Sequence, residues 1–537
     1  MTKQNKPAVS IAPGEWLAVL LLCAAASLVA VAWSWRNGAM LNYGDAVAHL
    51  HIARRVFDAR LPRFSMLGSV WLPLPHVLML PFVQVYGWWA NGAAALPSSV
   101  LSYLAGCAGI YRLARRWLSP QPAALALAFF ALNPNLLYLQ TTAMTEPLFL
   151  CEMIWVAVWM VEWRENLDSN PRRAQHRQVW IALMLVAAVF TRYDGWIMAA
   201  IAWTGIGLGL LKRGRLKSWS FWIASVFVLA APLAWFAYNA VCFGDFLEFA
   251  RGPYSAKAIE LRTAAHGAGP PHPGWHNSWV SLLFFLKAAE MDAAAAVWGN
   301  FLLALCTLGT LWAWFAKRKQ GFLWALLLWL PLPFYAYSVA YSSVPIFLPC
   351  WWPHSWYNTR YGMELLPALA VGLGFGLQGL LAAVRDFKPA WANFAAGFLF
   401  VALGLNAVQM LRERPLTYME GVKNIEARRQ FETEIPAALR AELVHWPQAT
   451  ILMDTSVHPN LVAFTGIPLR QTINESDLWI FHQALQAPAA YAQLILAFDG
   501  DAVDRAVKAH PEGLIPVATF TQQGQSPGRL YRSFELP

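Results

Sequence analysis

Residues 16–35, WLAVLLLCAAASLVAVAWSW, form an uninterrupted apolar run, and one membrane crossing requires about 20 such residues. Lys3 and Lys6 precede the run, and the positive-inside rule places them in the cytoplasm. The run is longer than the core of a signal peptide, and no clear processing site follows it. We therefore expect a retained first transmembrane helix with a cytoplasmic N-terminus.

Apolar runs of this kind recur as far as residue 410. The chain has 537 residues, of which 58% are hydrophobic and 13% are charged, whereas an average soluble domain carries about 25% charged residues. The expected spans are residues 16–35, 95–113, 121–139, 146–163, 179–193, 195–211, 219–241, 293–316, 322–341, 364–384 and 390–410. The sequence thus predicts a polytopic α-helical membrane protein with about 11 transmembrane helices.

Small basic clusters occupy every second gap between these runs. They are Lys3/Lys6, Arg112/Arg115/Arg116, residues 164–177, residues 212–217, Lys317/Arg318/Lys319 and Arg385/Lys388. With all of them in the cytoplasm, an odd number of spans places the C-terminal region outside. The net charge of +10 then reflects cytoplasmic anchors, because no basic and aromatic strip typical of nucleic-acid binding accompanies it.

Residues 71–89, WLPLPHVLMLPFVQVYGWW, complicate this topology because they are nearly long enough to cross the membrane. A span here would move every later basic cluster to the outer face. The segment contains three prolines and a histidine, so we expect an interfacial or re-entrant segment instead.

The composition changes near residue 411, which predicts a boundary between two domains. Residues 1–410 form the transmembrane domain, with a long first outer loop at residues 36–94. Residues 411–537 have interspersed charges, short strand-like runs at 450–453 and 492–497, and a helical pattern at 501–510. This region is expected to be a small soluble α/β domain.

The first outer loop opens with NYGD at residues 42–45 and continues as an amphipathic helix suited to the membrane surface. Asp45 lies just ahead of that helix. Its carboxylate could cap free N–H groups, or it could be a general base that takes a proton from an attacking hydroxyl. His49, one turn later, could join such a site or face the lipid headgroups.

Several motifs follow this loop in a characteristic order. They are the Arg112 to Arg116 cluster, TEP at residues 145–147, TRYDG at 191–195, and NTRY at 358–361 ahead of a helix with Pro367. With Asp45 they resemble the GT-C superfamily of membrane glycosyltransferases over roughly residues 16–410. The resemblance is to the branch that uses polyprenol-phosphate sugars, which includes protein O-mannosyltransferases and the lipid A aminoarabinose transferase.

The resemblance implies transfer of a sugar from a polyprenyl phosphate to an acceptor hydroxyl on the outer face, with inversion. Asp45 would be the general base and Glu146 a second acid that orients the acceptor or helps hold a metal. Glu146 could instead stabilise a helix N-terminus. His49 and Tyr361 would contact substrate.

The leaving phosphate needs a cation, and Arg360 is the preferred ligand because guanidinium binds phosphate oxygens bidentately. Arg360 could also be an interfacial anchor whose charged head reaches the headgroup layer. Arg192 could share the phosphate, although a local pair with Asp194 is favoured. Glu152 lies deeper in the same span as Glu146, and the resemblance gives it no role.

A metal site is not predicted, because His266, His272 and His276 lack any established zinc-ligand spacing. Divalent-metal dependence stays open, since members of the resembled family differ. A bacterial inner membrane with a periplasmic C-terminal domain is implied, with membrane lipids as partners and no nucleic acid. The donor sugar and the glycan, lipid or protein acceptor are not specified by the sequence.

Two other classes of function compete with the glycosyltransferase. A transporter or flippase for lipid-linked saccharides often shows inverted repeats, and no such symmetry is evident in this chain. A scaffold protein of envelope synthesis could use the C-terminal domain as a binding module.

Overall fold

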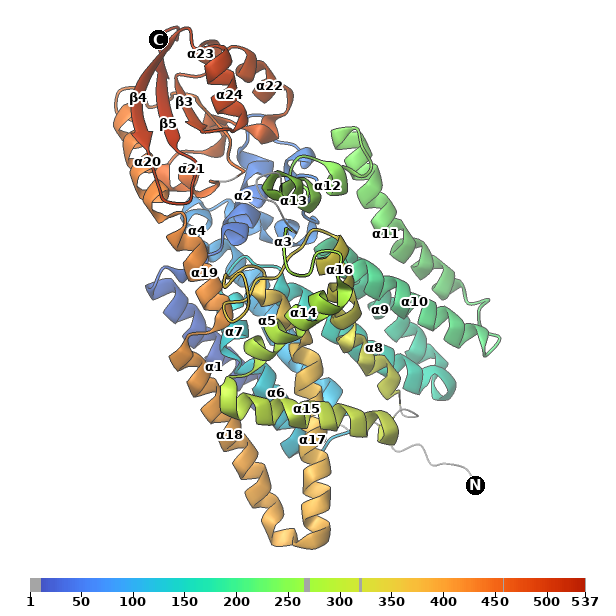
Figure 1. Cartoon of the computed structure of the whole chain (residues 1–537). Coiled ribbons are helices and arrows are strands. Elements are labelled where there is room, and N and C mark those ends of the chain that lie inside the picture. The colour runs from blue at the N-terminus through green and yellow to red at the C-terminus, as the bar shows by residue number, and fades with distance from the viewer. Residues whose placement is uncertain (1–10, 265–270, 318–320, 457, 537) are drawn as a thin grey trace. The chain divides into compact units, whose positions relative to one another are not determined.

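The computed structural model of the chain describes residues 11–264, 271–317, 321–456 and 458–536. They form two compact units, and Figure 1 labels the α-helices and the strands β3, β4 and β5. The first, called here the helical unit, consists of Met1–Ser34, Ser98–Thr141 and Thr145–Glu420. The second, called here the α/β unit, consists of Trp35–Pro97, Thr142–Met144 and Gly421–Pro537.

All eleven stretches predicted as spans are helical. The elements are α1 (Pro13–Arg36), α5 (Leu96–Ala114), α6 (Pro120–Ala131), α7 (Pro134–Leu139), α8 (Glu146–Ser169), α9 (Pro171–Thr191), α10 (Asp194–Leu211), α11 (Trp219–Phe243), α12 (Glu248–Arg251), α13 (Ala256–Ala264), α14 (Ser278–Ala293), α15 (Ala296–Lys317), η5 (Phe322–Trp329), α16 (Pro331–Tyr341), η6 (Thr359–Leu365), α17 (Leu366–Phe387), η7 (Pro389–Trp391), α18 (Ala392–Glu413) and α19 (Leu416–Glu426). The prediction of a multi-pass α-helical protein is therefore confirmed.

Eight helical stretches are long and apolar enough to cross a membrane, counted over the described residues. They are Pro13–Arg36, Ala93–Ala114, Asp194–Leu211, Trp219–Phe243, Val297–Ala316, Phe322–Tyr341, Thr359–Asp386 and Ala392–Glu426. Of the other three predicted spans, one is split between α6, of 12 residues, and the shorter α7. Helix α8 carries three glutamates within its apolar stretch, and α9 begins in a polar run. The total of eleven stays a prediction.

Ion pairs join the predicted cytoplasmic clusters at one end of the helical unit. Arg112, near the end of α5, pairs with Glu162 of α8 at 2.7 Å. Arg177 at the start of α9 also pairs with Glu162, and Arg213 after α10 pairs with Asp168 of α8. Three of the clusters thus lie on the same side of the unit, as the topology requires. Lys3, Lys6, Arg318 and Lys319 lie outside the described residues.

Helices α15 and α17 approach each other through glycine. A methyl group placed on Gly309 would collide with the backbone of Gly372 and Gly376. Small residues at such a crossing let two transmembrane backbones come into close contact, where packing replaces the missing hydrophobic driving force.

The segment at residues 71–89 forms two short helices, α3 (Leu74–Val83) and α4 (Tyr86–Asn91). Ten residues of α3 rise about 15 Å, half of the hydrocarbon thickness of about 30 Å. Neither helix can cross a membrane alone, which agrees with the interfacial or re-entrant interpretation.

The α/β unit is built on a five-stranded sheet in the order β2-β1-β3-β5-β4. Strands β2, β1 and β3 are parallel, whereas β5 and β4 are antiparallel additions. Besides α3 and α4, the elements are η1 (Ala39–Leu41), α2 (Gly44–Asp58), η2 (Phe64–Leu67), η3 (Ala93–Ala95), α20 (Arg429–Leu443), β1 (Ile451–Met453), α21 (Asn460–Thr465), η8 (Leu469–Gln471), β2 (Thr472–Ile473), η9 (Glu475–Asp477), α22 (Trp479–Gln486), α23 (Pro488–Tyr491), β3 (Leu494–Phe498), α24 (Ala502–Ala509), β4 (Leu514–Phe520) and β5 (Gly528–Ser533).

Strand β3 is buried along its whole length because helices cover both faces of the sheet. Ile495 and Ala497 pack in one core with residues of α22 and α24, such as Phe481 and Val503. Phe498 contacts Phe431 of α20, with 5.7 Å between the ring centroids. The strands and the helix expected at 450–453, 492–497 and 501–510 are therefore present as β1, β3 and α24.

The first outer loop belongs to the α/β unit, so the structural division differs from the predicted boundary near residue 411. Arg60 donates to the carbonyl oxygen of Thr472 at 3.2 Å, and the hydroxyl of Tyr86 donates to the carbonyl oxygen of Ala463 at 3.0 Å. Composition changes along the chain mark a change of environment, but they carry no information about which distant segments pack together.

The α/β unit should lose stability as the pH rises through Glu475. Burial, and then the negative charge of Asp454, raise the pKa of Glu475 from 4.5 to about 7. The folded state thus favours the protonated acid, and this contribution is complete below about pH 4.5 and lost as the pH rises through 7. Glu475→Gln should slow hydrogen exchange of the β1 and β2 amides at pH 8, relative to wild type, and change it little at pH 4.5. An equal effect at both pH values would contradict this assignment.

Candidate functional site

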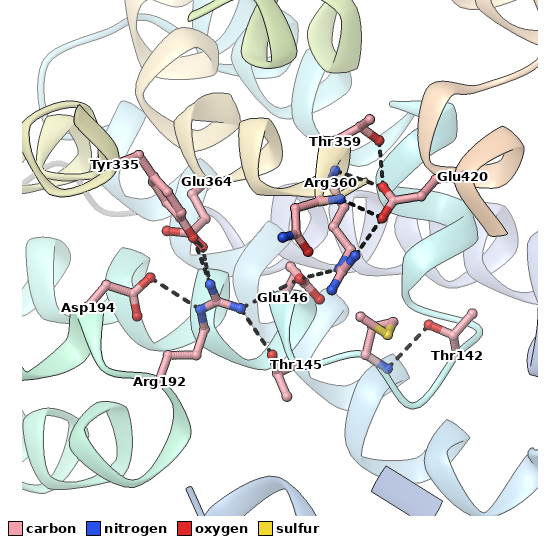
Figure 2. Close-up of polar contacts among 12 residues, drawn as sticks. Thr142, Thr145, Glu146, Arg192, Asp194, Tyr335, Thr359, Arg360, Glu364 and Glu420 are labelled. Atoms are coloured by element: carbon pink, nitrogen blue, oxygen red, sulfur yellow. Dashed lines mark hydrogen bonds and ion pairs between the residues drawn. The ribbon is translucent and has the colours of Figure 1, made fainter. Parts of the chain in front are cut away.

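Arg360 lies in a buried ion-pair network at the start of η6 (Figure 2). Its Nη1 donates to Oε1 of Glu420 at 2.6 Å, and its Nε donates to Oε1 of Glu146 at 3.1 Å. The residue is 4% exposed, so its charged head does not reach outward as an interfacial anchor would. That alternative for Arg360 is wrong.

Glu420 organises this end of the network. Its carboxylate accepts from the backbone N–H of Asn358 at 2.9 Å and from the hydroxyl of Thr359 at 2.6 Å, in addition to Arg360. These donors lie where η6 begins, and a carboxylate is favourable there because the N–H groups of a helix start lack intrahelical partners. Sequence reasoning missed Glu420, because it lies beyond the last predicted span and matches none of the quoted motifs.

Arg192 forms the second centre of the same network (Figure 2). It pairs with Glu364 at 3.0 Å and with Asp194 at 3.2 Å, so the local pair favoured from the sequence is present. The hydroxyl of Tyr335 accepts from Arg192 at 2.7 Å and donates to Glu364 at 2.6 Å. Glu364 and Tyr335 were not predicted, although Glu364 follows Arg360 by one helical turn.

Glu146 and Tyr361 connect the two arginines. Glu146, the first residue of α8, lies 3.1 Å from Arg360 and 3.5 Å from Arg192. The ring of Tyr361 has the two guanidinium carbons 5.1 Å and 5.2 Å from its centroid, within the range of cation–π contact. The structure thus brings together four of the six predicted site residues.

The network holds more carboxylate groups than guanidinium groups. Two guanidinium groups contact four carboxylates: Glu146, Asp194, Glu364 and Glu420. Among the described residues, Oε2 of Glu146 and Oε2 of Glu364 are buried without a hydrogen-bond partner. Such a site can accept a proton or a hydrogen-bond donor, whereas a phosphate would have to displace a carboxylate from an arginine.

The other two predicted site residues, Asp45 and His49, belong to the α/β unit. Asp45 is the second residue of α2, and the N-cap position belongs to Tyr43. Asp45 is thus not the N-cap residue, although an acid in the first turn is still stabilised by the helix dipole. The backbone N–H of Gly44, the first residue of α2, donates to Oδ1 of Asn424 at 3.4 Å.

His49 is buried and hydrogen-bonded within the α/β unit. Its Nδ1 lies 2.8 Å from Nε2 of His76, and its ring lies against Trp71, with 4.6 Å between centroids. At 4% exposure it does not face lipid headgroups, so that alternative is wrong.

No metal centre is found among the described residues: no group of three or more His, Cys, Asp or Glu side chains could hold an ion. His272 lies 3.5 Å from Glu260, and the backbone N–H of His276 bonds to Ala340. His266 lies outside the described residues. Glu152 accepts from the hydroxyl of Thr191 at 2.8 Å within the helical unit.

The fold is GT-C-like, as the resemblance in the sequence implied. Among solved structures, the chain is similar to the crystal structure of ArnT from Cupriavidus metallidurans bound to undecaprenyl phosphate. The TM-score is 0.59 at 15% sequence identity, and the match covers 97% of this chain and 98% of the ArnT chain. No protein-family model matches the chain, and no curated protein matches it in sequence.

Proposed function

We propose that the protein is an integral-membrane glycosyltransferase that moves a sugar from a polyprenyl phosphate to an acceptor hydroxyl on the outer face of the membrane. The observation that carries the proposal is the GT-C fold over 97% of the chain, shared with a protein that was crystallised with undecaprenyl phosphate. The position of Asp45, in the first turn of the helix that follows the first span, adds to this support.

In the proposed reaction the acceptor oxygen attacks the anomeric carbon of the donor. The bond between that carbon and the phosphate oxygen breaks, and the polyprenyl phosphate leaves with its electron pair. Attack from the opposite face inverts the configuration. Asp45 takes the proton from the acceptor hydroxyl as the new glycosidic bond forms.

Arg360 and Arg192 are the proposed ligands of the donor phosphate, because a guanidinium matches phosphate geometry. Both are held by buried carboxylates, so binding a phosphate requires that an acid give way or take up a proton. Glu146 contacts both arginines and is the acid that we propose responds to the phosphate. Tyr361, beneath both guanidinium groups, is proposed to contact the donor.

His49 is proposed to contact substrate from α2, one helical turn after Asp45. A divalent metal remains compatible with the proposal if the donor phosphate supplies ligands. We place the protein in a bacterial inner membrane, with a cytoplasmic N-terminus and a periplasmic C-terminal region. The acceptor is a glycan, a lipid or a protein.

The proposal is tested with purified protein in lipid nanodiscs, given radiolabelled polyprenyl-phosphate sugars and a panel of acceptors. Transfer of label to an acceptor, with release of polyprenyl phosphate, supports it. Movement of intact labelled donor across a liposome bilayer, without transfer, would indicate a transporter or flippase instead. Neither activity with any donor would favour a scaffold.

The proposed topology predicts opposite accessibility for two exposed positions of the helical unit. Lys217 follows α10 in a predicted cytoplasmic cluster, whereas Trp275, 42% exposed, lies in a predicted outer loop. The background should carry Cys350→Ser and Cys242→Ser, since Cys350 is exposed. In intact spheroplasts, an impermeant maleimide should label Trp275→Cys, and it should label Lys217→Cys only after permeabilisation. Equal labelling of both would contradict the topology.

A further inference from the structure

We propose that the C-terminal region positions the general base: Asn424 and Arg428 hold the turn ahead of α2, and so fix the carboxylate of Asp45. This inference rests on the proposed function, in which Asp45 takes the acceptor proton. It gives the C-terminal region a part in the reaction, whereas the sequence suggested a separate domain.

The contacts are made to the backbone on the N-terminal side of Asp45. Nη2 of Arg428 donates to the carbonyl oxygen of Asn42 at 2.8 Å and to that of Leu41 at 3.3 Å. Oδ1 of Asn424, one helical turn earlier, accepts from the N–H of Gly44 at 3.4 Å. Two side chains from the C-terminal region therefore bond to three of the four residues that precede Asp45.

Arg428 is itself held by the core of the α/β unit. Its Nη1 donates to Oε1 of Glu432 at 2.6 Å, and the same oxygen accepts from Nδ2 of Asn460 at 3.1 Å. Arg428 directly precedes α20, whose Phe431 packs against Phe498 of the sheet. The position of the guanidinium is thus set by the folded C-terminal region.

Charge adds to this geometry. Burial lowers the pKa of Arg428, and the nearby carboxylates of Glu432 and Asp45 act in the opposite direction. Asp45 is thus close enough to Arg428 for the two charges to interact.

The test compares Arg428→Ala, Arg428→Lys and Asn424→Ala with Arg440→Ala. Arg440 lies in α20 and donates to the carbonyl oxygen of Phe464, away from the turn that precedes Asp45, and is therefore a matched control.

Misplacement of a reacting group by about 1 Å can cost about 100-fold in rate, so Arg428→Ala should lower kcat by about 10- to 100-fold. The donor KM should stay within about threefold, because the base does not bind the lipid phosphate. Arg428→Lys should recover part of kcat, and Arg440→Ala should stay within about twofold of wild type.

Hydrogen exchange supplies a second measurement that needs no substrate. Asn424→Ala and Arg428→Lys should both speed exchange of the amides of residues 43–46, with the β3 amides unchanged. Unchanged exchange at these amides would overturn the positioning role even if the protein is a glycosyltransferase. Wild-type kcat in Arg428→Ala, or an equal loss in Arg440→Ala, would also overturn it. Failure of the proposed function would appear separately, as no transfer by the wild type, whereas full activity of Asp45→Asn would remove the base on which this inference rests.

Discussion

Replacing Asp45 with Asn is expected to lower the rate of sugar transfer by about 100- to 10,000-fold, the range that a positioned general base contributes. Asparagine has nearly the shape of aspartate but cannot take the proton of the acceptor hydroxyl. The change lies in the first turn of α2, where the N-cap position belongs to Tyr43, so the helix should persist. Transfer is measured with radiolabelled donor at saturating acceptor, and donor binding by equilibrium dialysis.

The control for this variant is Glu434→Gln, which neutralises an exposed acid of α20. It should transfer sugar at the wild-type rate. Asp45→Asn should bind the donor as wild type does, because the loss concerns a proton and not the phosphate. Full transfer by Asp45→Asn would remove Asp45 from the mechanism and leave the fold assignment intact.

The sequence could predict the parts of this structure that depend on local composition. Apolar runs mark helices because each backbone group inside a membrane must be bonded within its own segment. The prolines at residues 71–89 correctly indicated that this segment is not a continuous span, although α3 contains Pro81 and the break between α3 and α4 falls after Val83. The ion pair between Arg192 and Asp194 could also be predicted from the sequence, because the two residues are close in the chain.

Partners that are distant in the chain could not be predicted in this way. Glu420 binds Arg360 across 60 residues, and Arg428 binds Asn42 across 386. In neither pair does the sequence around the donor or the acceptor indicate which distant residue it bonds to. The sequence placed Glu146, Arg192 and Arg360 on the same side of the membrane. That placement does not indicate which of these side chains contact one another, nor that the network holds more carboxylates than guanidinium groups.

Glu420→Ala should destabilise the helical unit strongly, because it removes the carboxylate that accepts from Arg360 at 2.6 Å and from Asn358 at 2.9 Å. Breaking a buried ion pair by removing one partner typically costs about 3–5 kcal/mol, since the other charge remains buried. The Tm in detergent, followed by tryptophan fluorescence, should therefore fall clearly. Glu420→Gln, which keeps one acceptor oxygen, should lose less. The double variant Glu420→Met with Arg360→Met should regain part of the lost Tm, because it removes a buried guanidinium that has lost the shorter of its two ion pairs and keeps only Glu146. If the double variant were less stable than Glu420→Ala, the cost would come from lost packing at the start of η6 and not from the weakened pairing of Arg360.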